Sequence, residues 1–171
     1  MKKIIVSDSS TLILVQKIGL LGKLARRFKF MMPEKVYQEV VVEGKHRKTS
    51  DAYHLEEEIR KKRLIVAKVN DKAKAENIAN EFGIGPGEAE ALALFFQVNA
   101  SIVATDDHKA INACKAFKVP FITALTFVVE AHHNRIIVGE TAKEMITLLG
   151  VYGRYKDELL IKALSIVEGK A

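Results

Sequence analysis

Apolar residues form short runs along the chain, separated by longer stretches in which they recur at helical spacing. Five of these runs are expected to be buried strands: Lys3–Ser7, Phe30–Met32, Leu64–Val69, Ser101–Thr105 and Val119–Ile122. Strands of this length separated by helices are typical of the α/β class. We therefore predict a mostly parallel central sheet with helices on both faces.

Apolar positions spaced three or four residues apart predict helices in the rest of the chain. Pro33 is expected to stop the second strand and to begin the next helix, and Asp71 is suited to cap another. The polar, glycine-containing segment Glu43–Ser50 is expected to be a loop. The predicted helices are Ser10–Ile18, Leu20–Phe28, Glu34–Val42, Asp51–Arg63, Asp71–Phe82, Glu88–Val98, Asp107–Phe117, Thr123–Asn134, Glu140–Leu149 and Lys156–Glu168.

The chain has the length of a single domain, 171 residues, and contains no proline-rich or glycine/serine-rich linker. No stretch approaches the roughly 18 apolar residues of a transmembrane helix. The apolar run Ile4–Val6 is too short for a secretory signal, so we expect a cytoplasmic protein without a membrane partner. The single cysteine, Cys114, cannot form an internal disulfide, and its spacing from apolar neighbours predicts a small buried residue.

Basic residues outnumber acidic ones by 27 to 21, which gives a net charge of +6. With the four acids described below set aside, 27 basic and 17 acidic residues remain, a balance of +10. Such a surface suits a polyanionic partner such as nucleic acid. Alternatively, the basic clusters are solvated helix faces. The clusters are Lys23, Arg26, Arg27 and Lys29; Lys45, Arg47 and Lys48; and Arg60, Lys61, Lys62 and Arg63.

Four acidic residues lie beside segments that are predicted to be buried. Asp8 follows the first strand, and Asp106, with Asp107 next to it, follows the fourth. Glu39 borders the apolar stripe of its helix, and Glu88 lies on such a stripe. Open α/β sheets place their ligand sites at the carboxyl ends of strands. Carboxylates gathered there repel one another and are poorly solvated, so their clustering predicts a bound cation.

Each of these acids also has a structural alternative. Asp8 is placed to cap the helix that follows it, although a neighbouring serine would serve equally. One residue of the Asp106-Asp107 pair is expected to cap the next helix; we assign Asp106 as the ligand and Asp107 as the cap or an accessory ligand. Glu88 would gain from the helix dipole, and a boundary glutamate such as Glu39 is usually solvated.

Carboxylates without histidine or thiolate suit Mg²⁺ or Mn²⁺. An ion held by several carboxylates polarises a phosphodiester and lowers the pKa of the water that attacks it. Two ions about 3.5–4 Å apart would activate the nucleophile and stabilise the leaving oxygen separately, with Asp8 and Asp106 bridging them. Ser10 or Thr105 is placed to hydrogen-bond a ligand or the attacking water.

Other combinations of residues in the sequence are weaker indications of a functional site. The adjacent His132 and His133 point in different directions on a helix, so a shared metal is not expected. The glycines at positions 83, 85 and 87 lack a following Lys-Ser/Thr pair, which excludes a P-loop. There is also no Gly-x-Ser-x-Gly elbow for a hydrolase serine.

The order and surroundings of the four acids resemble those of PIN domains, which are similar to nucleases of the flap-endonuclease type. The resemblance spans residues 3 to about 130. It implies a three-layer α/β/α sandwich with a mostly parallel sheet, and Mg²⁺- or Mn²⁺-dependent cleavage of RNA by the four acids. The segments that carry it are Val6–Ile13 with Asp8, Pro33–Val40 with Glu39, Gly87–Leu92 with Glu88, and Val103–Asp107 with Asp106.

Many small prokaryotic members of the family (VapC-type) are toxins of toxin–antitoxin pairs and form homodimers. The resemblance therefore implies an antitoxin protein and a second copy as partners, beside the RNA substrate. The fourth segment departs from the family pattern, because Asp106-Asp107 is followed by His108 and either aspartate, or both, is suited to bind metal. The chain also continues beyond a minimal PIN domain, so we expect a nuclease domain over residues 1–134 and a helical extension over residues 135–171 packed on it.

Two other functions are compatible with the sequence. A phospho-acceptor receiver domain also gathers aspartates around Mg²⁺, but it needs a lysine near the end of its last strand, and residues 119–124 contain none. A PIN-fold module that binds nucleic acid or protein without catalysis would bind RNA with strong salt dependence and no metal requirement. The presence of all four acids favours the enzyme.

Overall fold

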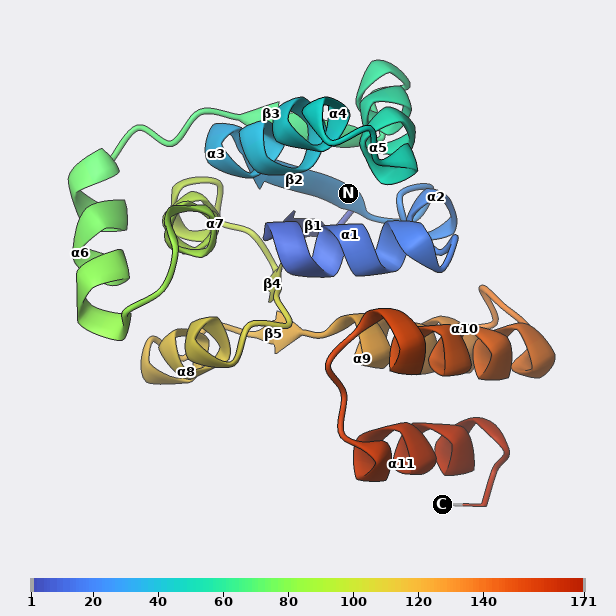
Figure 1. Ribbon diagram of the computed structural model, residues 1–171. Helices are drawn as coiled ribbons and strands as arrows, with labels where there is room; N and C mark the ends of the chain where they lie inside the picture. The colour runs from blue at the N-terminus through green and yellow to red at the C-terminus, as the bar shows by residue number, and fades with distance from the viewer. Residues whose placement is uncertain (1, 171) are drawn as a thin grey trace.

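A five-stranded sheet in which every pair of neighbours is parallel forms the centre of the computed structural model, which describes residues 2–170 (Figure 1). All five predicted strands are present, and the α/β class is confirmed. The strand order is β3-β2-β1-β4-β5. The strands are β1 (Ile4–Ser7), β2 (Lys29–Pro33), β3 (Leu64–Ala67), β4 (Ile102–Ala104) and β5 (Phe121–Ile122).

The chain changes its direction of winding at β1. Strands β2 and β3 extend the sheet on one side of β1, and β4 and β5 extend it on the other. A crevice at the carboxyl ends of the strands is expected where the order reverses, between β1 and β4. The order also differs from the 2-1-3-4-5 arrangement of receiver-type sheets, so a receiver domain does not fit this structure.

Helices account for most of the remaining chain. Asp71 caps α6 as predicted, since its side chain accepts a hydrogen bond from the Lys74 N–H at 2.9 Å. No helix within residues 2–170 is long and apolar enough to cross a membrane. The helices are α1 (Ser9–Lys17), α2 (Leu21–Leu24), α3 (Glu34–Tyr37), α4 (Glu43–His46), α5 (Ser50–Arg60), α6 (Lys72–Phe82), α7 (Pro86–Gln97), α8 (His108–Ala116), α9 (Ala124–His133), α10 (Gly139–Tyr152) and α11 (Asp157–Val167).

The loop predicted after residue 42 is wrong in its first half, because the helix continues. A five-residue π-helical segment, η1 (Gln38–Val42), joins α3 to α4. Gly44 does not form a turn; it lets α4 approach α5, since a Cβ atom at this residue would be only 2.8 Å from the Cβ of Ala52. Short π-helical segments occur frequently at functional sites, and this one contains Glu39.

Side chains of the strands alternate between two faces, and each face has its own helices. Ile5 and Phe30 pack in a buried cluster with α1, α2 and α9. Val6 packs on the opposite face against α6 and α7, and Val103 packs there against α6, α7 and α8. Figure 1 shows α6, α7 and α8 on one side of the sheet and α1, α2 and α9 on the other. This three-layer arrangement confirms the predicted sandwich, and Cys114 is fully buried in it as predicted.

The C-terminal helices α10 and α11 add to the layer that contains α1 and α9. Ile146 and Leu149 of α10 and Ala163 of α11 belong to the same buried cluster as Ile5. In Figure 1, α11 lies outermost, beyond α9 and α10. The division into residues 1–134 and 135–171 stays a prediction, and the apolar cluster itself is continuous across residue 134.

Candidate metal centre

The first and fourth acidic segments meet at the carboxyl ends of β1 and β4. These strands are neighbours, with Ser7 opposite Ala104, and the Asp8 N–H donates to the Ala104 carbonyl at 3.1 Å. Asp8 and the Asp106-Asp107 pair therefore leave the same edge of the sheet side by side. This is the point at which the strand order reverses.

Asp8 is completely buried and is held by three donors. Its Oδ1 accepts from the Thr11 N–H and the Ser10 hydroxyl, both at 3.0 Å, and its Oδ2 accepts from the Thr105 hydroxyl at 2.6 Å. Asp8 is thus the N-cap of α1, and the capping alternative describes it correctly. Burial nevertheless raises the pKa of Asp8 to about 7, with a smaller contribution from the negative charge of Glu88.

Glu39 lies half-buried on η1 and faces the first turn of α1. The Ser9 hydroxyl donates a hydrogen bond to its Oε2. Gly87 of α7 lies against the same carboxylate, because a Cβ atom at residue 87 would be 2.8 Å from Oε2. The lack of a side chain at Gly87 therefore allows Glu39 its position, and this contact joins the second acidic segment to the third.

Glu88 is half-buried in the first turn of α7, three residues after the N-cap Gly85. A Cβ atom at Gly85 would be 2.6 Å from its Oε2, and hydrogen bonding from backbone N–H groups lowers its pKa. These are features of a capping box, in which a glutamate reaches back to the N-cap. The pKa of Glu88 is raised overall, first by burial and then by the charges of Glu39 and Asp107. Glu88 therefore caps α7 and also lies within the cluster of acids.

Asp106 has both carboxylate oxygens engaged. Its Oδ2 accepts from the Thr11 hydroxyl at 2.7 Å and from the Ala124 N–H at 3.0 Å, and its Oδ1 accepts from the Tyr155 hydroxyl. Burial and the negative charge of Asp106 raise the pKa of Tyr155, so this hydroxyl stays protonated and acts as a donor.

Asp107 caps the next helix and also affects Glu88 through its charge. It is the N-cap of α8, as predicted, and accepts from the Ala110 N–H at 2.8 Å. Its negative charge also raises the pKa of Glu88. The assignment of Asp106 as the metal ligand and Asp107 as an accessory stays a prediction, and the contacts of the two carboxylates favour the reverse order.

The carboxylates of the five acids are not paired with any cation. Within residues 2–170, no Lys, Arg or His forms an ion pair with them. In that same range, no three His, Cys, Asp or Glu side chains are grouped so that they could hold a metal ion without moving. Glu39 and Glu88 are turned toward Ser9 and Gly85 instead. Hard oxygen donors with uncompensated charge fit Mg²⁺ or Mn²⁺, for which the two glutamates would exchange their present contacts.

The family model "DUF3368: PIN domain" matches residues 4–168 of the chain. The chain is a PIN-domain protein. The match covers the strands that lead to Asp8 and Asp106 and also the C-terminal helices. No curated protein matches the chain. PIN domains are in general nucleases and typically use divalent metal ions, so the chain has a nuclease-type fold.

Four residues that hold the acids of this PIN domain were not identified from the sequence: Ser9, Thr11, Gly87 and Tyr155. Ser9 and Thr11 lie in the hydroxyl-rich run after Asp8, but nothing in that run indicates which acid each contacts. Gly87 belongs to the segment that resembles the third PIN motif, but nothing in the sequence indicates that it lies against Glu39. Tyr155 has no local signal, since its partner lies 49 residues away in the chain.

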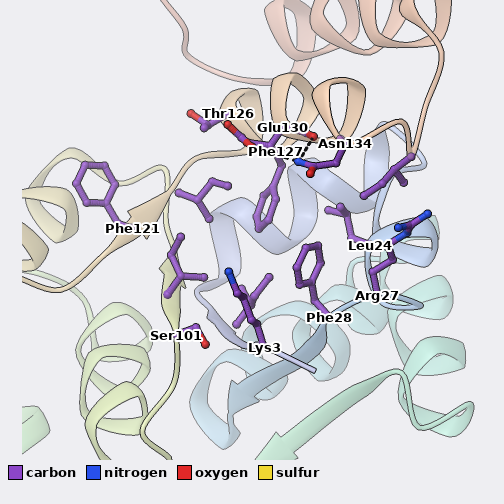
Figure 2. Close-up of a pocket in the computed structure, with 15 residues that line it drawn as sticks. Lys3, Leu24, Arg27, Phe28, Ser101, Phe121, Thr126, Phe127, Glu130 and Asn134 are labelled. Carbon is purple, nitrogen blue, oxygen red and sulfur yellow. Dashed lines mark hydrogen bonds between the residues drawn. The ribbon is translucent and has the colours of Figure 1, made fainter. Parts of the chain in front are cut away.

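A separate cavity of the PIN domain lies at the amino-terminal end of the sheet (Figure 2). It has a volume of about 750 Å³ and is lined by β1, β4, β5, α9 and the turn before β2. Figure 2 shows Lys3 near the rings of Phe28 and Phe127, with Arg27 beside Leu24. None of the five acids lines this cavity, so it is distinct from the candidate metal centre.

Two of the three basic clusters are partly paired with acids on the protein itself. Lys45 pairs with Glu56 at 2.5 Å, and Lys61 pairs with Glu57 at 2.6 Å. Such exposed pairs agree with the solvated-face alternative for these clusters. The first cluster ends at Lys29, the first residue of β2, and therefore lies at the edge of the sheet opposite the acids.

Replacing Asp8 with asparagine is expected to change how the stability of the metal-free protein depends on pH. The pKa of Asp8 is about 7 when folded and close to 3.8 when unfolded, so the folded state binds the proton more tightly. The free energy of unfolding is therefore highest below the unfolded pKa and falls as pH rises through about 7, by on the order of 4 kcal/mol. Urea unfolding in chelator at about pH 5 and pH 8 should show the part of this fall that lies above pH 5, about 3 kcal/mol, in the natural protein and a smaller fall in Asp8→Asn. Equal pH dependence of the two proteins would contradict it.

Gly87→Ala is expected to displace Glu39 and weaken metal binding. The added Cβ would be 2.8 Å from one carboxylate oxygen of Glu39 and 3.1 Å from the other, so the glutamate must move. Alanine is otherwise favoured over glycine in a helix by about 1 kcal/mol. We therefore expect roughly tenfold weaker Mn²⁺ binding by calorimetric titration, without a lower melting temperature in chelator. The matched control is Gly22→Ala in α2, where no heavy atom lies within 4 Å of the added Cβ. The same Mn²⁺ affinity in both variants would contradict the role of Gly87 in positioning Glu39.

Proposed function

We propose that this PIN domain is a divalent-metal-dependent endoribonuclease that hydrolyses phosphodiester bonds of RNA. The observation that carries the proposal is the fully buried carboxylate of Asp8 at the strand edge, without a cationic partner and with a pKa raised by burial. Glu39, Glu88 and the Asp106-Asp107 pair come from three other segments and lie around it. A nuclease fold with uncompensated acids at this edge is suited to metal-assisted hydrolysis.

The acids have different roles in this proposal. Asp8 is the central ligand, because Ser10 and Thr105 hold its carboxylate in one orientation. Glu39 and Glu88 complete the site from η1 and α7, and Asp107 from the first turn of α8. A bound Mg²⁺ or Mn²⁺ would polarise the phosphodiester and lower the pKa of the attacking water. Asp106 supports the site indirectly, through its hydrogen bonds with Thr11 and Ala124.

Charge outside the acid cluster supports RNA as the substrate. The chain carries a balance of +10 once four of the acids are assigned to the metal. His108 and Arg154 are exposed and directly follow or precede residues at the site, Asp107 and Tyr155. The positive charge of Arg154, next to a residue that contacts the acids, is suited to the phosphates of a nucleic acid.

The toxin role, a cognate antitoxin and a homodimer enter the proposal through the family resemblance. The C-terminal helices supply apolar surface for a protein partner: Val151 on α10 is 73% exposed, and Leu159 and Ile161 on α11 are 49% and 62% exposed. Extended exposed apolar surface is typical of protein interaction sites.

Cleavage of RNA is expected with Mn²⁺ or Mg²⁺ and is expected to disappear in chelator. Asp8→Asn and Glu88→Gln should each lower the rate at least about 100-fold, because metal stabilisation of the transition state is worth several kcal/mol. Labelled single-stranded and structured RNAs, incubated with each metal and resolved on a denaturing gel, provide the measurement.

Two variants serve as controls, one for loss of a helix cap and one for loss of a glutamate charge on α7. Asp71→Asn changes an N-cap of the same kind on α6, and Glu90→Gln changes a glutamate on α7 that pairs with Lys72 at 2.7 Å. Both should cleave at close to the natural rate. Cleavage that survives Asp8→Asn, Glu88→Gln and excess chelator would remove the proposed function. Salt-sensitive RNA binding without product under any metal would identify a binding module instead.

A further inference from the structure

The linker between α10 and α11 reaches back to the end of β4. Its Tyr155 donates a hydrogen bond to the Asp106 Oδ1, and the Leu125 N–H donates to the Tyr155 oxygen at 3.2 Å. The tyrosine therefore connects the C-terminal helical pair to the start of α9 and to the acidic segment. No other side chain of α10, α11 or their linker hydrogen-bonds to one of the five acids within residues 2–170.

Asp106 is the point at which four parts of the chain join. Its Oδ2 accepts from the Thr11 hydroxyl in α1 and from the Ala124 N–H at the start of α9, at 2.7 and 3.0 Å. Tyr155 engages the other oxygen. Hydrogen bonds to an ionised carboxylate are among the stronger ones in proteins, and three of them leave this side chain little freedom to turn.

The chain has a site built for the tyrosine ring. Gly153 lies directly beneath it, since a Cβ atom at residue 153 would be 2.8 Å from two ring carbons of Tyr155. The same Cβ would be 2.9 Å from the Leu149 carbonyl, so a larger residue would push the ring away from Asp106. The side chain of Tyr155 is partly buried, whereas the neighbouring Arg154 is exposed.

We propose that Tyr155 is a positioning residue, which holds Asp106 and thereby presents Asp107 to the metal-binding acids. The inference rests on the proposed function and assigns a part in it to the C-terminal extension. Asp107 is the next residue in the chain and the N-cap of α8. Fixing the carboxylate of Asp106 fixes the turn between β4 and α8, from which Asp107 acts on Glu88. Tyr155 itself touches neither the metal nor the RNA.

Tyr155→Phe tests this role, because it removes the hydroxyl and keeps the ring. We expect about tenfold weaker binding of Mn²⁺ by calorimetric titration, from the loss of one hydrogen bond to a charged group. In RNA cleavage, kcat should fall while KM for RNA stays the same. Tyr152→Phe is the matched control: Tyr152 is 47% exposed on α10, and its ring, which lies under the Lys17 ammonium, is kept.

A double-mutant cycle separates positioning through Asp106 from a general loss of stability. If Tyr155 acts through Asp106, the variant with both Asp106→Asn and Tyr155→Phe binds Mn²⁺ as weakly as Asp106→Asn alone. Gly153→Ala keeps the hydroxyl but displaces it, and it should weaken Mn²⁺ binding as Tyr155→Phe does. Circular dichroism and the melting temperature in chelator confirm that each variant is folded.

Three results would overturn the inference while the proposed function stands: unchanged Mn²⁺ affinity in Tyr155→Phe with a lower melting temperature, additive losses in the double variant, or tighter Mn²⁺ binding in Tyr155→Phe. The last result would mean that Tyr155 competes with the metal. If the natural protein neither binds Mn²⁺ nor cleaves RNA, the proposed function fails and the inference fails with it.

Discussion

The burial of the Asp8 carboxylate is the constraint on which the rest of the structure depends. A carboxylate without exposed surface is costly unless donors or a cation compensate for the lost water. Three donors do so here, from the first turn of α1 and from the residue after β4. Folding of α1 onto the sheet, and pairing of β1 with β4, are therefore coupled to the solvation of one side chain. The raised pKa of Asp8 shows that the donors compensate only in part.

Hydroxyl groups and glycines, rather than the acids themselves, bring the four segments together. Ser9 joins the first segment to the second, Thr11 joins the first to the fourth, and Gly87 lets the second approach the third. The first turn of α1 therefore contacts two of the other three acidic segments. These contacts hold the carboxylates in place despite the repulsion among like charges, which contributes to the raised pKa of Glu88. A bound cation would replace part of this compensation.

The C-terminal helices are joined to the rest of the domain by apolar packing and by a hydrogen bond. Their apolar side chains complete the cluster that covers one face of the sheet, and the family match extends through them to residue 168. Tyr155 also links them to the acidic end of β4. A segment that follows the last strand therefore bears on the geometry of a site whose acids all precede it. The exposed apolar residues of α10 and α11 lie on this same segment.

The sequence by itself determined the five strands, the two-faced sheet and the acids at its edge, because hydrophobic periodicity and position after a strand are local properties. It did not reveal helix α4, since Gly44 resembles a turn residue and only the close approach of Ala52 shows why a glycine is needed. It predicted Asp107 as a helix cap, but it gave no indication of the side chains that engage Asp106. Only the tertiary structure shows these contacts, because the partners of Asp106, Thr11 and Tyr155, lie 95 and 49 residues away along the chain.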